Sequence, residues 1–148
     1  MKISSKKGFT LAEILLAIAI LAFALCAILI TYISCFALVA TSKNVSIATS
    51  ASQGLIEEIR ATPFGQITDD YNGLNFIVNN IPPNRGVVYV DDTDPELLKV
   101  TVSVCWLQGN KIIGEDANLN GALDPGEDRN GNGIIDSTVE LATLVVNR

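Results

Sequence analysis

The feature that most constrains this chain is an uninterrupted apolar run close to its N-terminus, from Ile14 to Ala40. The run contains no charged residue, no proline and no glycine. A helix rises about 1.5 Å per residue, so a helix of this length covers roughly 40 Å. Crossing a bilayer takes only about 20 residues. We therefore expect one helix that crosses a membrane.

Basic residues precede the apolar run and set its orientation. Lys2, Lys6 and Lys7 lie before it, and no comparable cluster follows it. The positive-inside rule then keeps the N-terminus in the cytoplasm and sends the rest of the chain across the membrane. An ordinary secretory signal differs, because it places a shorter apolar run before a cleavage site of small residues.

One carboxylate, that of Glu13, stands where the apolar run begins. A charged side chain costs about 2.5–3.5 kcal/mol at the centre of a membrane helix, and less near its end. A buried charge persists when it has a partner. Glu13 is therefore a candidate functional residue.

The residues from Lys6 to Glu13 read KKGFTLAE and resemble the class III leader of type IV prepilins and type II secretion pseudopilins. The resemblance implies that a prepilin peptidase removes a leader peptide of residues 1–8 by cutting after Gly8. The same enzyme would methylate the new N-terminal amine of Phe9, giving methylphenylalanine. The resemblance also implies that Glu13 pairs with the N-terminal amine of a neighbouring subunit in a filament. The alternative is a plain signal anchor with a chance glutamate.

Helical periodicity continues beyond the apolar run as far as Ala61, and the following Thr-Pro pair ends it. We expect residues 9–40 to form the transmembrane or filament-core half of one helix. Residues 41–62 would form its amphipathic half and pack on the following domain. Segment 51–64 also resembles minor pilins and the I-type minor pseudopilin. The apolar stripe of the amphipathic half, spaced by three and four residues, consists of Val45, Ala48, Leu55 and Ile59.

Residues 63–148 predict a small sheet domain outside the membrane. We expect residues 63–75 to be loop, and strands at 75–79, 86–91, 97–107, 111–113 and 138–146. In the third strand, apolar residues alternate with smaller or polar ones: Val100, Val102, Val104 and Trp106 against Thr101, Ser103 and Cys105. The alternation predicts one buried face and one solvent-facing face. The predicted class is α+β, in which a long N-terminal helix packs on a small antiparallel sheet, and the third and last strands resemble those of the minor pilin domain.

Between the last two strands lies an insert, residues 115–136, in which one unit occurs twice: EDANLNGALD begins at Glu115 and EDRNGNGIID at Glu127. The first unit fits the calcium-loop template from Asp116 to Glu127. Such a loop supplies oxygen ligands at alternate positions, bends at a glycine, and ends on a glutamate that binds with two oxygens. The predicted ligands are Asp116, Asn118, Asn120, Ala122 through its carbonyl, Asp124 and Glu127, followed by Asp128, Asn130, Asn132 and Asp136.

The second unit lacks the terminal glutamate, because Val139 occupies that position. Its calcium would be weakly held unless Glu140 or Glu127 substitutes. No helix is expected on either side, so the pair is not an EF-hand, and it resembles the tandem calcium loops of dockerins and thrombospondin type 3 repeats. The insert carries six carboxylates and one arginine, so calcium would relieve repulsion and order it. The alternative is a surface turn rich in Asn-Gly that binds nothing.

Composition excludes several kinds of site. The chain has no histidine, which removes Ser-His-Asp and Cys-His catalysis and His-based zinc sites. The net charge of −6 argues against a nucleic-acid surface. Cys26 and Cys35 lie on opposite faces of the expected helix and cannot form a disulfide with each other, and Cys105 stands alone outside the membrane.

The chain is not expected to be an enzyme. Asp91, Asp92 and Asp94 could in principle hold a metal ion, but three acids beside a proline are more often a solvated turn. The features predict instead a structural subunit, a minor one, of a type IV pilus or pilus-like filament. Major pilins often carry a glycine or proline in the membrane half, and this chain has neither between Phe9 and Gln53.

Two other functions fit the same features. One is a minor pseudopilin of a type II secretion system, and the other is a membrane-anchored, calcium-dependent adhesin that does not polymerise. The implied partners are other pilin or pseudopilin subunits, the prepilin peptidase and the inner-membrane assembly platform, with no nucleic acid. The precursor would cross the inner membrane once with a cytoplasmic N-terminus, and the mature subunit would enter a pilus or a periplasmic pseudopilus. Calcium is the one cofactor predicted.

Overall fold

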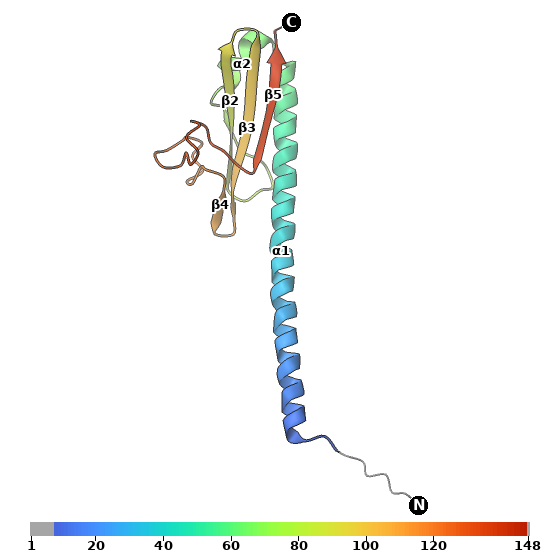
Figure 1. The fold of residues 1–148 in the computed structure, drawn as a ribbon. Helices are drawn as coiled ribbons and strands as arrows, with labels where there is room; N and C mark the ends of the chain where they lie inside the picture. Colours follow the sequence, from blue (N-terminus) through green and yellow to red (C-terminus); the bar gives the residue numbers. More distant parts are fainter. Residues whose placement is uncertain (1–7, 148) are drawn as a thin grey trace, which may run out of the picture. The chain divides into compact units, whose positions relative to one another are not determined.

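The protein combines one long helix with a small antiparallel sheet, and the computed structural model describes residues 8–147 (Figure 1). The described chain divides into two compact units, one ending at Ala40 and one beginning at Thr41. The α+β class, a pilin-like arrangement, is confirmed. The elements are α1 (Leu11–Ala61), α2 (Phe64–Tyr71), β1 (Asn75–Phe76), β2 (Asn84–Asp94), β3 (Leu97–Gln108), β4 (Lys111–Ile113) and β5 (Val139–Val146).

The first unit consists of the apolar half of α1 and the residues just before it. Every described residue up to Ala40 is exposed, including large apolar side chains such as Phe23 and Leu38. Within residues 8–147, α1 is the one helix long and apolar enough to cross a membrane. A contiguous apolar surface of this extent marks contact with lipid or with other proteins.

In the second unit, the later turns of α1 pack on the sheet. Ala48 and Ile59 of the predicted stripe are fully buried, whereas Val45 and Leu55 are partly buried at its margins. The buried line of the helix also contains Asn44, Ser52 and Ile56. Sequence reasoning missed this line because it assigned polar side chains to the solvent face.

The buried Asn44 is accommodated by hydrogen bonds. Its Nδ2 group donates to Gln108 Oε1 at 2.7 Å, and the same oxygen accepts from Trp106 Nε1 at 3.1 Å. A buried polar group is tolerated when it is bonded in this way. The contact joins α1 to the end of β3.

Strand β3 is the centre of the five-stranded sheet, whose order is β1-β2-β3-β4 with β5 also paired to β3. All pairs are antiparallel. One edge of β3 pairs with β2, from Trp106 opposite Asn84 to Lys99 opposite Asp91. The other edge is shared, because β5 pairs with the first part of β3 and β4 with its last residues.

The hydrophobic core lies between α1, α2 and one face of the sheet. Burying each large apolar side chain contributes about 1.5–3 kcal/mol. On this face of the sheet, the described residues form two clusters. The first contains Ile56, Ile59, Ile67, Val88, Val90, Leu98, Val100 and Val102, and the second contains Ala48, Val78, Val104, Trp106 and Val139.

The prediction of a loop over residues 63–75 is wrong, because α2 occupies most of it. Pro63 ends α1, since proline cannot continue the hydrogen-bond ladder, and α2 begins at the next residue. Ile67 is buried, and Phe64 and Tyr71 pack against the first cluster. These three residues share one face of the short helix. Asp69 and Asp70, an acidic pair of the kind that is common in turns, lie on its exposed face.

The predicted strand 75–79 is shortened to Asn75–Phe76 by a side chain that replaces a strand partner. The Val78 N–H donates to Asn84 Oδ1 at 2.8 Å, and Asn84 Nδ2 donates to the Val78 carbonyl at 2.9 Å. These bonds satisfy the backbone N–H and carbonyl of Val78 without pairing to a neighbouring strand. The other predicted strands are present, with β2 extending beyond both predicted ends.

The prediction of a solvent-facing side for β3 is also wrong. Thr101, Ser103 and Cys105 are 5%, 1% and 1% exposed. The insert covers this face, where Ile135 forms a third buried cluster with Val87 and Cys105, and Tyr89, Leu119 and Leu123 pack against it. Strand β3 is therefore buried on both faces, by α1 on one side and by the insert on the other.

A glycine in β2 tests the packing of the short strand β1. Gly86 pairs with Phe76, and an added Cβ would overlap the Phe76 ring. We expect Gly86→Ala to lower the free energy of unfolding by about 1–3 kcal/mol, because overpacking forces the ring aside. Urea unfolding of the detergent-solubilised chain, followed by fluorescence of Trp106, measures this.

The control is Gly65→Ala on α2, where nothing lies within 4 Å of an added Cβ. It should leave stability unchanged or raise it slightly, because alanine is the better helix former. Equal loss of stability in the two variants would contradict the packing described.

Candidate functional site

The predicted cleavage site lies before the helix. Gly8, Phe9 and Thr10 are exposed and precede the start of α1. Phe9 is 85% exposed. The leader residues 1–7 lie outside the described residues. The described part of the site is thus accessible and not helical.

Glu13 closes the first turn of α1 in partnership with Thr10. The Thr10 N–H donates to Glu13 Oε2 at 2.8 Å, and the Thr10 hydroxyl donates to the same oxygen at 2.9 Å. The Glu13 N–H donates back to the Thr10 hydroxyl at 3.3 Å. This is a capping box, in which two residues three positions apart satisfy the free amides of a helix start. Sequence reasoning missed it, although the Thr-x-x-Glu spacing was its signal.

The first loop of the insert turns its acceptor side chains onto its own amides. Asp116 Oδ1 accepts from the Asn120 N–H at 3.0 Å, and Asp116 Oδ2 accepts from the Gly121 N–H at 2.8 Å. The side-chain amides of Asn118 and Asn120 both donate to Asp124 Oδ2, at 2.7 and 2.9 Å. The bend needs the φ of +79° at Gly121, which glycine adopts readily.

Glu127 closes the first loop, as the template requires. Its Oε1 accepts from the Ala117 N–H at 2.8 Å, and its Oε2 accepts from the Asp124 N–H at 3.0 Å. The Ala122 N–H donates to Asn120 Oδ1 at 2.7 Å. All the predicted ligands of this loop therefore belong to one hydrogen-bonded unit.

The second loop repeats these contacts. Asp128 accepts from the N–H groups of Asn132 and Gly133 at 3.2 and 2.9 Å, with Gly133 at a φ of +78°. The side-chain amides of Asn130 and Asn132 both donate to Asp136. The Gly133 N–H, above all, holds the pKa of Asp128 below its ordinary value. The sequence repeat is thus also a structural repeat.

The loops do not form an all-carboxylate metal site. Among residues 8–147, no three Cys, Asp or Glu side chains converge on one point where they could hold a metal ion. In each loop, the side-chain oxygens of asparagine accompany the carboxylates, and both kinds of oxygen accept from loop amides. The structure brings the predicted ligands of each loop together, and calcium remains a prediction.

The insert is bonded to the sheet near both loops. Arg85 Nε donates to the Leu119 carbonyl at 3.2 Å, and the Ile135 N–H donates to the Tyr89 hydroxyl at 3.0 Å. Burial raises the pKa of Tyr89, so its hydroxyl stays neutral at physiological pH. Sequence reasoning missed Arg85 and Tyr89, because neither belongs to a motif and only the folded chain brings them to the insert.

The three cysteines are free. Cys26 and Cys35 are exposed on α1, as predicted for residues that cannot pair. Cys105 lies beneath the insert, where its Sγ donates to the Asp136 carbonyl at 3.8 Å. Burial raises the pKa of the Cys105 thiol, which keeps it protonated and unreactive.

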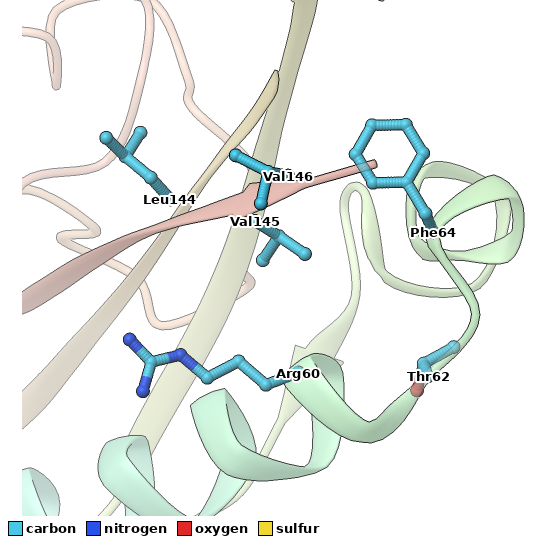
Figure 2. A pocket seen from close by; sticks show the side chains of 6 residues that line it. All are labelled: Arg60, Thr62, Phe64, Leu144, Val145 and Val146. Atoms are coloured by element: carbon cyan, nitrogen blue, oxygen red, sulfur yellow. The ribbon is translucent and has the colours of Figure 1, made fainter. Parts of the chain in front are cut away.

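A pocket lies between the end of α1, the start of α2 and β5 (Figure 2). Arg60 contributes its guanidinium, which donates to Thr143 Oγ1 at 2.6 Å and pairs with Glu57 at 3.0 Å. Apolar residues supply most of the remaining wall, among them Phe64 and Val146. Arg60 is therefore bonded both to β5 and to its own helix.

The acids at the end of β2, where the chain turns toward β3, are solvated. Asp91 Oδ1 accepts from the Thr93 N–H at 3.1 Å and from its hydroxyl at 2.5 Å. Asp94 Oδ1 accepts from the Glu96 N–H at 2.9 Å. All of these residues, and Asp92, are exposed. The Thr93 hydroxyl is the main cause that holds the pKa of Asp91 below its ordinary value.

We expect Thr93→Val to raise the pKa of Asp91 toward its ordinary value of about 4, because the hydroxyl donor is lost. A depressed pKa stabilises the folded state above the unfolded-state pKa, and this contribution is lost as pH falls through the folded-state pKa. The wild-type chain should therefore lose more stability than the variant on acidification below about pH 4. Carboxyl NMR titration measures the pKa, with Thr138→Val at an exposed position as control. An unshifted Asp91 in Thr93→Val would count against this turn.

The comparisons with known proteins bear on the N-terminal part of the chain. The prokaryotic N-terminal methylation motif matches residues 3–29, which include the predicted cleavage site, Glu13 and the first half of the apolar run. No curated protein and no solved structure matches the chain. The motif, the exposed apolar helix and the antiparallel sheet all fit the pilin-like arrangement. The match supports the class III prepilin leader expected from the sequence, and the motif and the exposed apolar helix together fit a membrane-anchored, pilin-like protein.

Proposed function

We propose that the chain is a minor structural subunit of a type IV pilus or pilus-like filament. The observation that supports this most is that the apolar half of α1 is exposed along its whole length and begins within a matching methylation motif. Prepilin peptidase cuts after Gly8 and methylates Phe9. Until assembly, residues 9–40 hold the subunit in the inner membrane, with the new N-terminus on the cytoplasmic side and the sheet unit beyond the membrane.

Assembly moves the apolar helix from lipid into a bundle of neighbouring helices. Both environments are apolar, so the exchange gains little from hydrophobicity, and packing and polar contacts decide it. Cleavage creates a cation at the Phe9 amine, about one helical turn from Glu13. Pairing between the Glu13 carboxylate and this amine on an adjacent subunit sets the register. The capping contact with Thr10 keeps the carboxylate bonded before assembly.

A minor pseudopilin of a type II secretion system is the second candidate. Segment 51–64 resembles both the minor pilins and the I-type minor pseudopilin, so it fits this candidate as well as the first. In both machines the partners are other pilin or pseudopilin subunits and the inner-membrane assembly platform. The subunit acts by packing, not by catalysis.

We also propose that the insert binds calcium. The tandem template, the shared hydrogen-bond pattern of the two loops and their acidic charge support this. In a filled loop, the ion takes the place of the Asn118 and Asn120 amide donors on Asp124. Extracellular sites of this class bind at about 0.1–1 mM, a range that external calcium reaches. Bound calcium then fixes the layer that covers the second face of β3.

The assembly proposal predicts that Glu13→Ala is lost from sheared surface filaments while the membrane fraction keeps the subunit. The expected loss is about tenfold or more, since about 1.4 kcal/mol changes an equilibrium tenfold. Quantitative immunoblots of both fractions measure it. Thr10→Ala, which removes the capping hydroxyl and keeps the backbone N–H, and Glu57→Ala, at an exposed position in the amphipathic half, are the controls.

Both controls should assemble close to the wild-type level. Normal assembly of Glu13→Ala would contradict the pairing and favour a membrane-anchored adhesin that does not polymerise. An equal loss of Thr10→Ala from the filaments would mean that Glu13 acts only by capping the helix and not by pairing between subunits.

The calcium proposal predicts that about 10 mM calcium stabilises the detergent-solubilised chain against urea by about 1.4–2.7 kcal/mol per site, given affinities of about 0.1–1 mM. Sodium chloride at matched ionic strength is the control, because it screens the carboxylates without filling a loop. Equal stabilisation by the two salts, with no heat on calcium titration, would remove the proposal.

A further inference from the structure

The second loop cannot obtain its closing carboxylate from its own twelfth position. Val139 occupies that position and is 3% exposed in the second core cluster. Sequence reasoning left Glu140 and Glu127 as replacements. Both oxygens of Glu127 are bonded to amides of the first loop, so Glu127 belongs to that loop.

Glu115 makes the corresponding contacts in the second loop. Its Oε1 accepts from the Arg129 N–H at 3.1 Å, and its Oε2 accepts from the Asp136 N–H at 3.3 Å. Arg129 and Asp136 stand at the same places in the second unit as Ala117 and Asp124 in the first. Glu115 and Glu127 are themselves equivalent residues of the two units. Each glutamate therefore precedes one loop and closes the other.

Burial and charge give an independent reason to place a cation here. Glu115 is 7% exposed and the adjacent Asp116 is fully buried. Within residues 8–147, the one direct ion pair joins Arg60 and Glu57, so neither of these carboxylates is in direct contact with a basic side chain, and Arg129 lines the same pocket as Glu115 without pairing with it. A buried charge without an opposite charge is strongly unfavourable. Backbone amides bond the oxygens but leave the net charge, which a bound cation would compensate.

Glu140 does not make the closing contacts. It is exposed on β5, and within the described chain the amides of Arg129 and Asp136 donate to Glu115. Glu140 pairs with Ser103 of β3 and its carboxylate lies close to that of Asp136, but within the described chain the loop amides that would close the site donate to Glu115. The carboxylate best placed to close the second loop is that of Glu115.

We propose that Glu115 is the closing ligand of a second calcium site, so that the insert binds two ions through exchanged glutamates. This rests on the calcium binding proposed above. The exchange couples the loops, because Glu115 and Asp116 are neighbours in the chain and serve different ions. Filling one loop fixes the backbone that carries a ligand of the other, and the two ions bind as a cooperative pair.

The test counts the calcium ions bound by the full chain in detergent, by equilibrium dialysis against calcium at several millimolar. The wild type should bind two ions. Glu115→Gln and Glu127→Gln should each bind one, and Glu140→Gln, the matched control, should bind two. Glutamine keeps the size and an acceptor oxygen, and near-ultraviolet circular dichroism of Trp106 reports whether each variant is folded.

Double variants separate a lost site from a lost fold. Asp128→Asn lies in the second loop, so its combination with Glu115→Gln should still bind one ion, whereas Glu115→Gln with Glu127→Gln should bind none. Two ions in Glu115→Gln, with one in Glu140→Gln, would overturn the assignment to Glu115 and leave calcium binding intact. No bound calcium in the wild type would overturn the calcium proposal itself.

Discussion

The apolar half of α1 has to be covered by lipid or by other helices, and this requirement governs the rest of the chain. Its side chains are exposed from Phe9 to Ala40. Each square ångström of apolar surface left in water costs about 25 cal/mol. The methylation motif at residues 3–29 covers the start of this helix and fits a helix that is anchored in a membrane. The chain also needs a polar contact that distinguishes a filament from lipid, and Glu13 is the one carboxylate in that half.

The sheet unit meets a different requirement, because its central strand β3 is buried on both faces. The amphipathic half of α1 covers one face through Ile56 and Ile59. The insert covers the other through Ile135, with Arg85 and Tyr89 bonded to its backbone. The insert is thus part of the packed core and not an exposed loop without contacts to the sheet. Any ion that orders its acidic loops also stabilises the sheet, which links the proposed calcium sites to the exposed part of a filament.

Local patterns were enough to predict the helix α1 and strand β4, whose ends the sequence places within a residue or so. They failed where distant parts of the chain decide. Ser103 and Cys105 look solvent-facing in sequence, and only the folded insert buries them. The loop prediction for residues 63–75 gave more weight to the turn-forming pairs Asp69-Asp70 and Asn72-Gly73 than to the helical spacing of the apolar residues. Phe64, Ile67 and Tyr71 have that spacing, and all three pack in the core. The sequence could have suggested a role for Glu115, because it occupies the same position in the first unit as Glu127 in the second. Only the structure shows that Glu115 accepts hydrogen bonds from the second loop.

The central claim is that the carboxylate of Glu13 is kept in an apolar helix to meet an amine that processing creates. The most direct measurement is the intact mass and N-terminal residue of the protein purified from its own host. The account predicts that the chain begins at Phe9 with a methylated amine. A chain that still begins at Met1, in a host that contains prepilin peptidase, would contradict it.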